Sequence, residues 1–203
     1  MKKLLSLIAL MGFMQMNAQS IEKQTTRSGV YYAVKLNAKT VFHDIDIALR
    51  NYGTQGVYTE SSSTSSIGLN LGMGYHINKK LDVAINLAYD EYLGDVTYTL
   101  DLYDQDFPYI LELRSMPLTA QFKYNFSERI SSWYVSGDIG TQLNWSGKWA
   151  SGAITAASFG KSIPISSKAN LDAALTFDYR TVTNIPYVVD KIYSIGVSCG
   201  VSF

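Results

Sequence analysis

The last eleven residues of the chain, YSIGVSCGVSF, alternate strictly between apolar and small polar side chains. Successive side chains of a β-strand point to opposite faces, so one face of this stretch carries only serine and glycine. The other face is wholly apolar and carries Tyr193, Ile195, Val197, Cys199, Val201 and Phe203. A tilted strand needs about 9 to 11 residues to cross a bilayer. The stretch therefore predicts a strand of a transmembrane β-barrel, with its apolar face toward lipid.

The same alternation recurs in seven earlier segments, and the last strand is expected to close the barrel by pairing with the first. Eight is an even number, as in single-chain bacterial outer-membrane barrels. The sequence thus predicts an all-β fold, an eight-stranded antiparallel up-and-down transmembrane β-barrel. The alternation is weakest in the sixth segment, which is alanine-rich and contains Pro164. The strands are expected at residues 30–36, 67–76, 81–90, 118–126, 133–143, within 152–165, 171–180 and 193–203.

The connections and the aromatic residues support a barrel in a membrane. Connections after the first and third strands are long, at residues 38–66 and 91–114, and those after the second, fourth and sixth are short. Outer-membrane barrels place short turns in the periplasm and long loops outside. A soluble alternative, a lipocalin-like carrier, gains nothing from aromatics gathered at strand ends. The aromatics predicted to form two interfacial girdles are Tyr75, Tyr89, Tyr124, Phe126, Trp133, Trp145 and Tyr179.

The N-terminal residues predict export of the chain. A basic start, MKK, precedes an apolar run that is too short to span a membrane as a helix. We expect a signal peptide at residues 1–18, cleaved within a residue or two of that boundary, a short periplasmic arm at 19–28, and the barrel at 29–203. The predicted location is the outer membrane of a Gram-negative cell, with outer-membrane lipid as a partner.

Composition agrees with this location and argues against nucleic acid as a partner. Charged residues make up 17% of the chain, against about 25% in ordinary globular proteins. Aromatic residues make up 13%, with 15 tyrosines. The 17 basic residues fall to 15 once Lys2 and Lys3 leave with the signal peptide, against 17 acidic ones. A net charge of −2 gives no electrostatic reason to bind nucleic acid.

Three features together resemble a known family. They are the series of eight strands, the segment SMPLTAQFKYNF at residues 115–126, and the final strand with its terminal aromatic. They resemble the small outer membrane protein β-barrel domain family, which is similar to the OmpX and OmpA barrels. In such families the final strand is recognised by the barrel-insertion machinery, and no biochemical activity is implied. The resemblance implies this assembly signal at Tyr193, Val197, Cys199, Val201 and Phe203.

The inward positions of the predicted strands are polar and often charged. The interior of an eight-stranded barrel is just wide enough for side chains to fill it. Charges there must pair or be hydrated, because an isolated buried charge costs several kcal/mol. We therefore expect a filled polar lumen, with a narrow porin-like channel as the alternative. The predicted lumen residues are Lys35, Asn70, His76, Asp82, Asn86, Asp90, Lys123, Asp138, Asp172, Asp178 and Arg180.

Catalytic chemistry has little support in the sequence. His76 is expected to point inward at the periplasmic end of the second strand, and His43 is expected in the first external loop. Neither has a serine and an acidic residue at a recognisable spacing, so no catalytic residues are predicted. A lipid-modifying enzyme remains an alternative, to be tested by substituting these two histidines.

No metal or cofactor is predicted either. The string formed by His43, Asp44 and Asp46 is too short to indicate a metal site. The acidic segment with Asp101, Asp104 and Asp106 lacks the glycine turn and distal glutamate of a calcium loop. The external loops are rich in tyrosine and tryptophan, which either extend the girdle or bind an extracellular partner. The predicted function is a non-enzymatic barrel with a structural, interaction or adhesion role.

Overall fold

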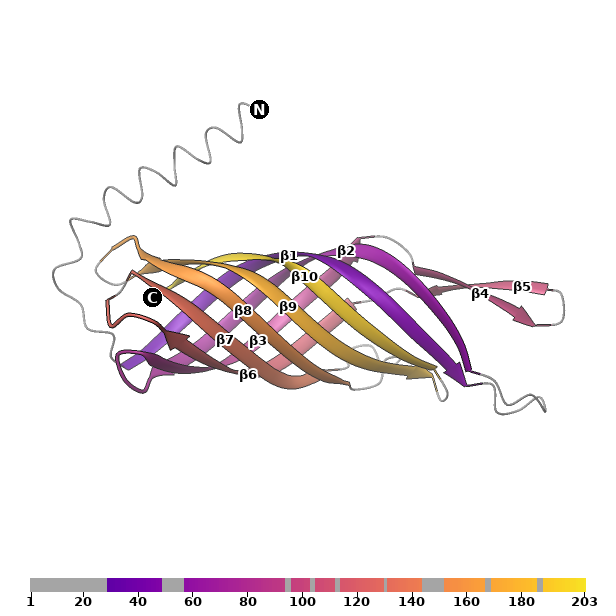
Figure 1. The fold of residues 1–203 in the computed structure, drawn as a ribbon, viewed down its shortest axis with the longest axis horizontal. Coiled ribbons are helices and arrows are strands. Elements are labelled where there is room, and N and C mark those ends of the chain that lie inside the picture. Colours follow the sequence, from indigo (N-terminus) through magenta and orange to yellow (C-terminus); the bar gives the residue numbers. More distant parts are fainter. Residues whose placement is uncertain are drawn as a thin grey trace, which may run out of the picture.

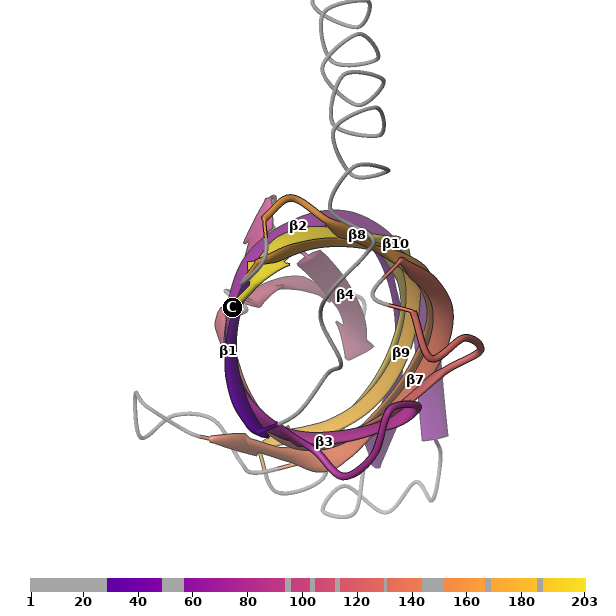
Figure 2. The same cartoon turned by 90° about the vertical axis from the view of Figure 1, so that its left-hand side faces the viewer.

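The chain folds into one closed antiparallel β-barrel of eight strands, which confirms the predicted fold (Figures 1 and 2). The computed structural model describes residues 29–48, 57–93, 96–102, 105–111, 114–129, 131–143, 152–166, 169–185 and 188–203. No helix in these ranges is long and apolar enough to span a membrane. The predicted signal peptide, the periplasmic arm and Trp145 lie outside the described residues. The barrel strands are β1 (Gly29–Ala48), β2 (Val57–His76), β3 (Leu81–Leu93), β6 (Arg114–Asn125), β7 (Ser132–Leu143), β8 (Ala153–Pro164), β9 (Asn170–Ile185) and β10 (Val188–Ser202).

The strands follow one another around the barrel in the order β1-β10-β9-β8-β7-β6-β3-β2, and β2 pairs with β1. The barrel closes where β10 pairs with β1, with Cys199 opposite Leu36. This is the predicted closure between the last and first strands. Two further strands, β4 (Val96–Leu102) and β5 (Gln105–Leu111), form a separate two-stranded sheet within the connection from β3 to β6. We call the end with the β2–β3, β6–β7 and β8–β9 turns the periplasmic end, and the opposite end the external end.

The structure corrects the predicted extent of the first hairpin. Residues 38–66 were expected to be a long connection, but β1 and β2 are 20 residues each. Their pairing runs without a break from Gly29 opposite His76 to Ala48 opposite Val57. The outward face of β2 changes from large apolar residues to serine beyond Ile67, at Ser65 and Ser63. A strand that leaves the lipid no longer needs an apolar face, so hydrophobic alternation ends before the strand does.

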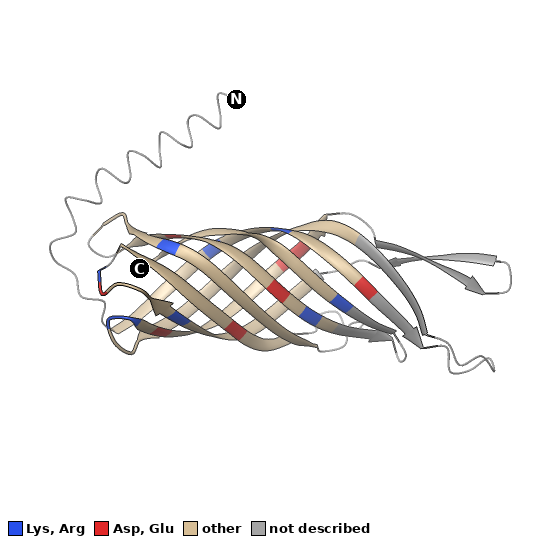
Figure 3. Cartoon of the chain, in the orientation of Figure 1, with Lys and Arg blue, Asp and Glu red and all other residues tan. Residues whose placement is uncertain are grey.

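The outside of the barrel is apolar and the inside is polar. Ile195 and Val197 of β10, and Phe203 directly after it, expose more than half of their surface, and similar apolar side chains cover the other strands. The buried side chains are mostly serine, asparagine, glutamine, aspartate, lysine and arginine. Figure 3 shows the charged residues spaced along the strands between the two ends. This inversion of the usual soluble arrangement is that of a membrane-spanning barrel.

Candidate functional site in the barrel lumen

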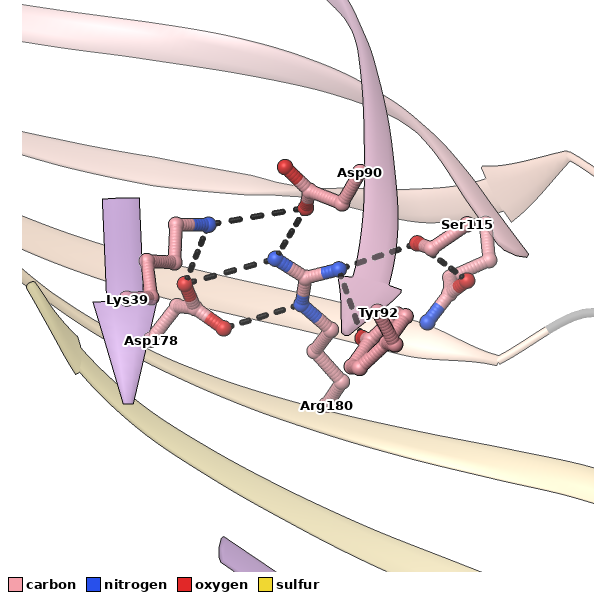
Figure 4. A network of polar contacts seen from close by, with 7 residues as sticks. Lys39, Asp90, Tyr92, Ser115, Asp178 and Arg180 are labelled. Atoms are coloured by element: carbon pink, nitrogen blue, oxygen red, sulfur yellow. Dashed lines mark hydrogen bonds and ion pairs between the residues drawn. The ribbon is translucent and has the colours of Figure 1, made fainter. Parts of the chain in front are cut away.

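An arginine at the external half of the lumen lies at the centre of the largest polar cluster (Figure 4). Arg180 extends inward from β9 and is only 2% exposed. Its Nη2 donates to Asp90 Oδ2 of β3 at 2.6 Å. Its Nε donates to Asp178 Oδ1 at 2.8 Å, and Nη2 lies 3.4 Å from the other oxygen of that carboxylate. Charge-assisted bonds of this length are about twice as strong as neutral ones.

Lys39 of β1 supplies a second cation to the same cluster. Its Nζ lies 2.8 Å from Asp178 Oδ2 and 3.5 Å from Asp90 Oδ2. Two cations and two carboxylates therefore compensate each other within a space that is almost fully buried. We call Lys39, Asp90, Asp178 and Arg180 the lumen ion cluster. Pairing offsets the cost of burying these charges, and further hydrogen bonds to the remaining donors and acceptors lower it.

The remaining donors of Arg180 bond to neutral partners. Its Nη1 donates to Ser115 Oγ of β6 at 2.9 Å and lies 3.4 Å from the Tyr92 hydroxyl oxygen. The Ser115 hydroxyl in turn donates to Gln142 Oε1 of β7 at 2.7 Å. The network thus reaches from β1 and β3 through β6 and β7 to β9.

The local sequence places these side chains in the lumen. Asp178 and Arg180 are two residues apart on β9, so they share its inward face. Asp90 pairs with Gly68 of β2, and a side-chain carbon at that glycine would overlap the Asp90 carboxylate. Lys39 pairs with Gly196 of β10, which likewise has no side chain to collide with the lysine stem. Glycine opposite a large charged residue is what allows the narrow lumen to hold it.

An apolar cluster covers the ion cluster on its external side. Val41 and Ile192 are each 1% exposed and pack with Tyr92. Val41 follows Lys39 on the inward face of β1, and Ile192 pairs with Arg180. These side chains separate the ion cluster from the external end, which lowers the local dielectric and strengthens the ion pairs.

His43 was predicted to lie in an external loop, and that prediction is wrong. The residue is part of β1, its side chain is 1% exposed, and its ring centroid lies 5.9 Å from that of Tyr92. The error follows from the early end predicted for the first strand. Asp44 is half-buried on the same strand, and the Asp46 side chain lies outside the described part of the structure.

Two further polar groups fill the lumen toward the periplasmic end. Asp138 of β7 accepts hydrogen bonds from Gln121 Nε2 at 3.0 and 3.1 Å and from Asn86 Nδ2 at 3.2 Å. Lys123 of β6 forms an ion pair with Asp172 of β9 at 3.1 Å. The Asn86–Asp138 and Lys123–Asp172 contacts connect strands that are not neighbours in the barrel wall.

The Lys123–Asp172 pair has additional partners around it. Lys123 Nζ donates to Ser162 Oγ at 3.2 Å, and the Ser162 hydroxyl is hydrogen-bonded to Asp172. The same ammonium group lies 4.0 Å from the centroid of the Tyr134 ring, within the range of a cation–π interaction. A buried lysine is thus held by a carboxylate, a hydroxyl and an aromatic face.

The periplasmic mouth holds the remaining predicted histidine. His76 Nδ1 lies 2.6 Å from Asp82 Oδ1, and Asn125 Nδ2 donates to the other carboxylate oxygen at 3.0 Å. The His76 ring stacks on Tyr31, with centroids 4.6 Å apart. An Asp–His pair orients an imidazole, but nucleophilic catalysis also needs a hydroxyl or thiol beside it. Within the described ranges, His76 has no hydrogen bond to a serine, threonine or cysteine.

The predicted lumen residues all lie on inward strand positions, and the structure brings most of them together in these groups. Lys35 and Asn70 pair across β1 and β2 and are half-buried. The sequence reasoning missed Lys39, Tyr92 and Ser115. Lys39 is four residues after Lys35 on the same strand and therefore on the same inward face. Extending the period-two pattern by two more positions would have predicted it.

The predicted girdle residues face outward near the two ends of the barrel. Tyr75, Tyr124, Phe126 and Trp133 are exposed toward the periplasmic end. Toward the external end, Tyr89 and Tyr179 occupy outward positions, and the Tyr89 hydroxyl is hydrogen-bonded to Glu91. The Tyr179 ring lies 5.0 Å from that of Tyr193 on the neighbouring strand. The predicted assembly-signal residues also face outward on β10.

Comparison with known proteins identifies the fold. No protein-family model matches the chain, and no curated protein matches its sequence. Among solved structures, the chain is similar to the outer membrane protein OprG from Pseudomonas aeruginosa, at 13% identity and a TM-score of 0.52 over 87% of this chain and 97% of that one. It also matches Neisserial surface protein A, at 15% identity and a TM-score of 0.47 over 82% of this chain and 97% of that one.

A third match is the attachment invasion locus protein Ail of Yersinia pestis. It has 14% identity and a TM-score of 0.37 over 87% of this chain and all of that one. At such identities similarity establishes a fold and leaves activity to be argued from the residues. The similarity to an outer membrane protein agrees with the location predicted from the sequence. The chain therefore has the closed eight-stranded fold of the small outer-membrane β-barrels.

Proposed function

We propose that the protein is a non-enzymatic outer-membrane barrel that is closed to ions and acts as a structural and interaction protein through its external end. The observation that carries this proposal is the bond between Arg180 and Asp90. Their strands, β9 and β3, are separated by three strands in either direction around the barrel. A 2.6 Å bond between opposite walls supports a lumen that is obstructed at that depth.

Two other contacts support a lumen filled along its length. Lys123 and Asp172 join β6 to β9 across two intervening strands, and Asn86 and Asp138 join β3 to β7 across one. Removing one partner from a buried pair costs about 3–5 kcal/mol, so spontaneous opening of such contacts is rare. The apolar cluster of Val41, Ile192 and Tyr92 adds a second barrier outside the ion cluster.

Single-channel recording in planar bilayers tests the closed lumen. Purified wild-type protein should give no discrete conductance steps in 1 M KCl. Arg180→Met should give such steps or at least a raised leak, because it removes the side chain that joins the two walls. Reproducible conductance from the wild-type protein would show that the lumen is an open pore and would reverse the proposal.

A narrow gated channel is the second candidate, and a specific observation favours it. Several polar atoms facing the lumen are buried and have no hydrogen-bond partner among the described residues, including Asp90 Oδ1, Thr176 Oγ1 and Ser194 Oγ. Buried polar groups of this kind are usually satisfied by water. A hydrated column beside the lumen ion cluster becomes an ion path if Arg180 moves. Voltage-dependent channel openings in planar-bilayer recordings of the wild-type protein support this function if they disappear when Arg180 is held in place.

The external end supports the interaction part of the proposal. The β1–β2 ladder extends beyond Ile67, which among the described side chains is the last large apolar residue on the outward face of β2. We infer that this part of the barrel wall projects past the lipid. An epitope tag inserted in the connection at residues 49–56 should bind antibody on intact cells. Binding only after permeabilisation would reverse the proposed orientation.

A further inference from the structure

One lysine lies on the lipid-facing side of the barrel where an apolar residue would be expected. Lys161 is on the outward face of β8, between Phe159 and Ile163. Among the described side chains, only Asp44, Glu91, Lys161 and Lys191 are charged residues at outward strand positions. The other three lie near the external end. Lys161 is therefore the one such charge at the periplasmic end of the lipid-facing wall.

The described contacts of Lys161 are with an aromatic side chain. Its register partners are Trp133 on β7 and Ala173 on β9. The ammonium nitrogen lies 5.5 Å from the centroid of the Trp133 ring. That ring stacks on Phe159, with centroids 5.2 Å apart and an interplanar angle of 11°. Lys161 makes no ion pair with any residue whose side chain the structure describes.

The level of the Lys161 ammonium group in the bilayer indicates which anion it can bind. Trp133 is the second residue of β7 and belongs to the periplasmic aromatic girdle, which lies at the level of the lipid headgroups. A lysine stem along apolar surface places its ammonium group at the same level. The anion present there is the phosphate diester of a phospholipid in the periplasmic leaflet. The side chains of Phe159 and Leu175, paired across β8 and β9, continue the apolar surface toward the membrane centre.

We propose that Lys161 and Trp133 form a binding site for one anionic phospholipid of the periplasmic leaflet. Lys161 binds the phosphate, the Trp133 ring holds the ammonium group and the glycerol region, and an acyl chain lies along Phe159 and Leu175. The site rests on the proposed position of the barrel in a bilayer. An anionic lipid is favoured over a zwitterionic one because a choline or ethanolamine group repels the unpaired ammonium group.

Native mass spectrometry of the full-length protein tests this site. The protein is released from micelles containing phosphatidylglycerol or phosphatidylcholine, and the bound-lipid fractions are compared. Wild-type protein should retain phosphatidylglycerol in preference to phosphatidylcholine. Lys161→Met should reduce the retained phosphatidylglycerol about fivefold, as expected for one basic residue near anionic lipid. Lys161→Arg should keep most of the binding, because it preserves the cation.

Lys79→Met is the matched control. Lys79 is in the periplasmic β2–β3 turn, is more than half exposed, and lies 3.4 Å from Glu128. Its loss removes the same charge from the same end of the barrel without changing the proposed site. An equal loss of lipid binding in Lys79→Met and Lys161→Met would mean that only general surface charge attracts the lipid, and would overturn the site. Unchanged retention in Lys161→Met would overturn it as well.

A fluorescence measurement gives a second readout that does not depend on release into the gas phase. Replacing Trp145 and Trp149 with phenylalanine leaves Trp133 as the single tryptophan of the chain. In vesicles, phosphatidylglycerol with brominated acyl chains should quench Trp133 more strongly than brominated phosphatidylcholine at the same mole fraction. Lys161→Met should remove that difference. Equal quenching by both lipids in the single-tryptophan protein that retains Lys161 contradicts the proposal. If the barrel does not insert in the bilayer, neither lipid quenches Trp133.

Discussion

The lumen ion cluster makes a quantitative prediction about Arg180. The Arg180→Met substitution keeps an apolar side chain of similar length but removes its bonds to Asp90, Asp178 and Ser115. Lys39 then faces two carboxylates alone. This leaves one uncompensated negative charge on Asp90 and Asp178, whose side chains are 2% and 3% exposed. Removing one partner from a buried ion pair typically costs 3–5 kcal/mol, so the free energy of unfolding should fall by about that amount.

Equilibrium urea unfolding of the barrel in phospholipid vesicles, followed by tryptophan fluorescence, measures this change. The double variant Arg180→Met, Asp90→Asn restores a neutral cluster of Lys39 and Asp178. It should recover at least half of the lost stability, so the two substitutions should be strongly non-additive. The control Lys79→Met breaks an exposed pair with Glu128 and should change the unfolding free energy by less than about 1 kcal/mol.

The reasoning fails under either of two results. One is an Arg180→Met barrel within about 1 kcal/mol of the wild type, which would mean that water compensates the carboxylates. The other is a double variant that is less stable than Arg180→Met, since charge balance would then not be the cause. A stability loss without any increase in conductance would retain the ion cluster as a structural element and remove its role in closing the lumen.

Three further predictions concern single positions. Cys199 is the only cysteine and faces outward on β10, so a spin label there should be more accessible to oxygen than to a water-soluble nickel complex; the opposite ratio would place this face in water. Gly68→Ala should destabilise the barrel by about 1–3 kcal/mol because its methyl group overlaps the Asp90 carboxylate, and by clearly less in an Asp90→Ala background. Deleting Phe203 removes two backbone hydrogen bonds and a ring contact to Tyr32 and should lower the yield of heat-modifiable barrel in cells; normal yield would exclude Phe203 as the assembly signal.

The part of the fold that the sequence predicts is the part in contact with lipid. On β10 the lipid requires an apolar residue at every second position, and the residues from Tyr193 onward satisfy this requirement. Beyond the lipid the outward face of a strand meets water and no longer needs apolar side chains, so the alternation disappears although the backbone pairing continues. His43 was misplaced for that reason, since it follows the last clearly alternating residues of β1.

The pairing of charges across the lumen was not predictable from the pattern alone. The alternation assigns Asp90 and Arg180 to the inside, but their depth depends on strand tilt and on the stagger between strands. Lys39 was not predicted to be in the lumen because β1 continues beyond the residues in which apolar and polar side chains alternate clearly. Lys161 is the reverse case, a charge at a position that the pattern assigns to lipid, and its pairing with Trp133 appears only once β7 and β8 are placed side by side.

The contact between Asp90 and Arg180 joins residues that are 90 positions apart in the chain. They lie on opposite walls, so they can meet only when the strands from β9 through β8, β7 and β6 to β3 have curved around the lumen. A partly assembled sheet would leave Asp90 without Arg180, although Arg180 would still have Asp178 on its own strand. An unpaired buried charge costs several kcal/mol. We therefore expect intermediates in which Asp90 lacks this partner to be poorly populated. The contact across the lumen should favour cooperative assembly of the barrel, because it forms only when the two walls come together.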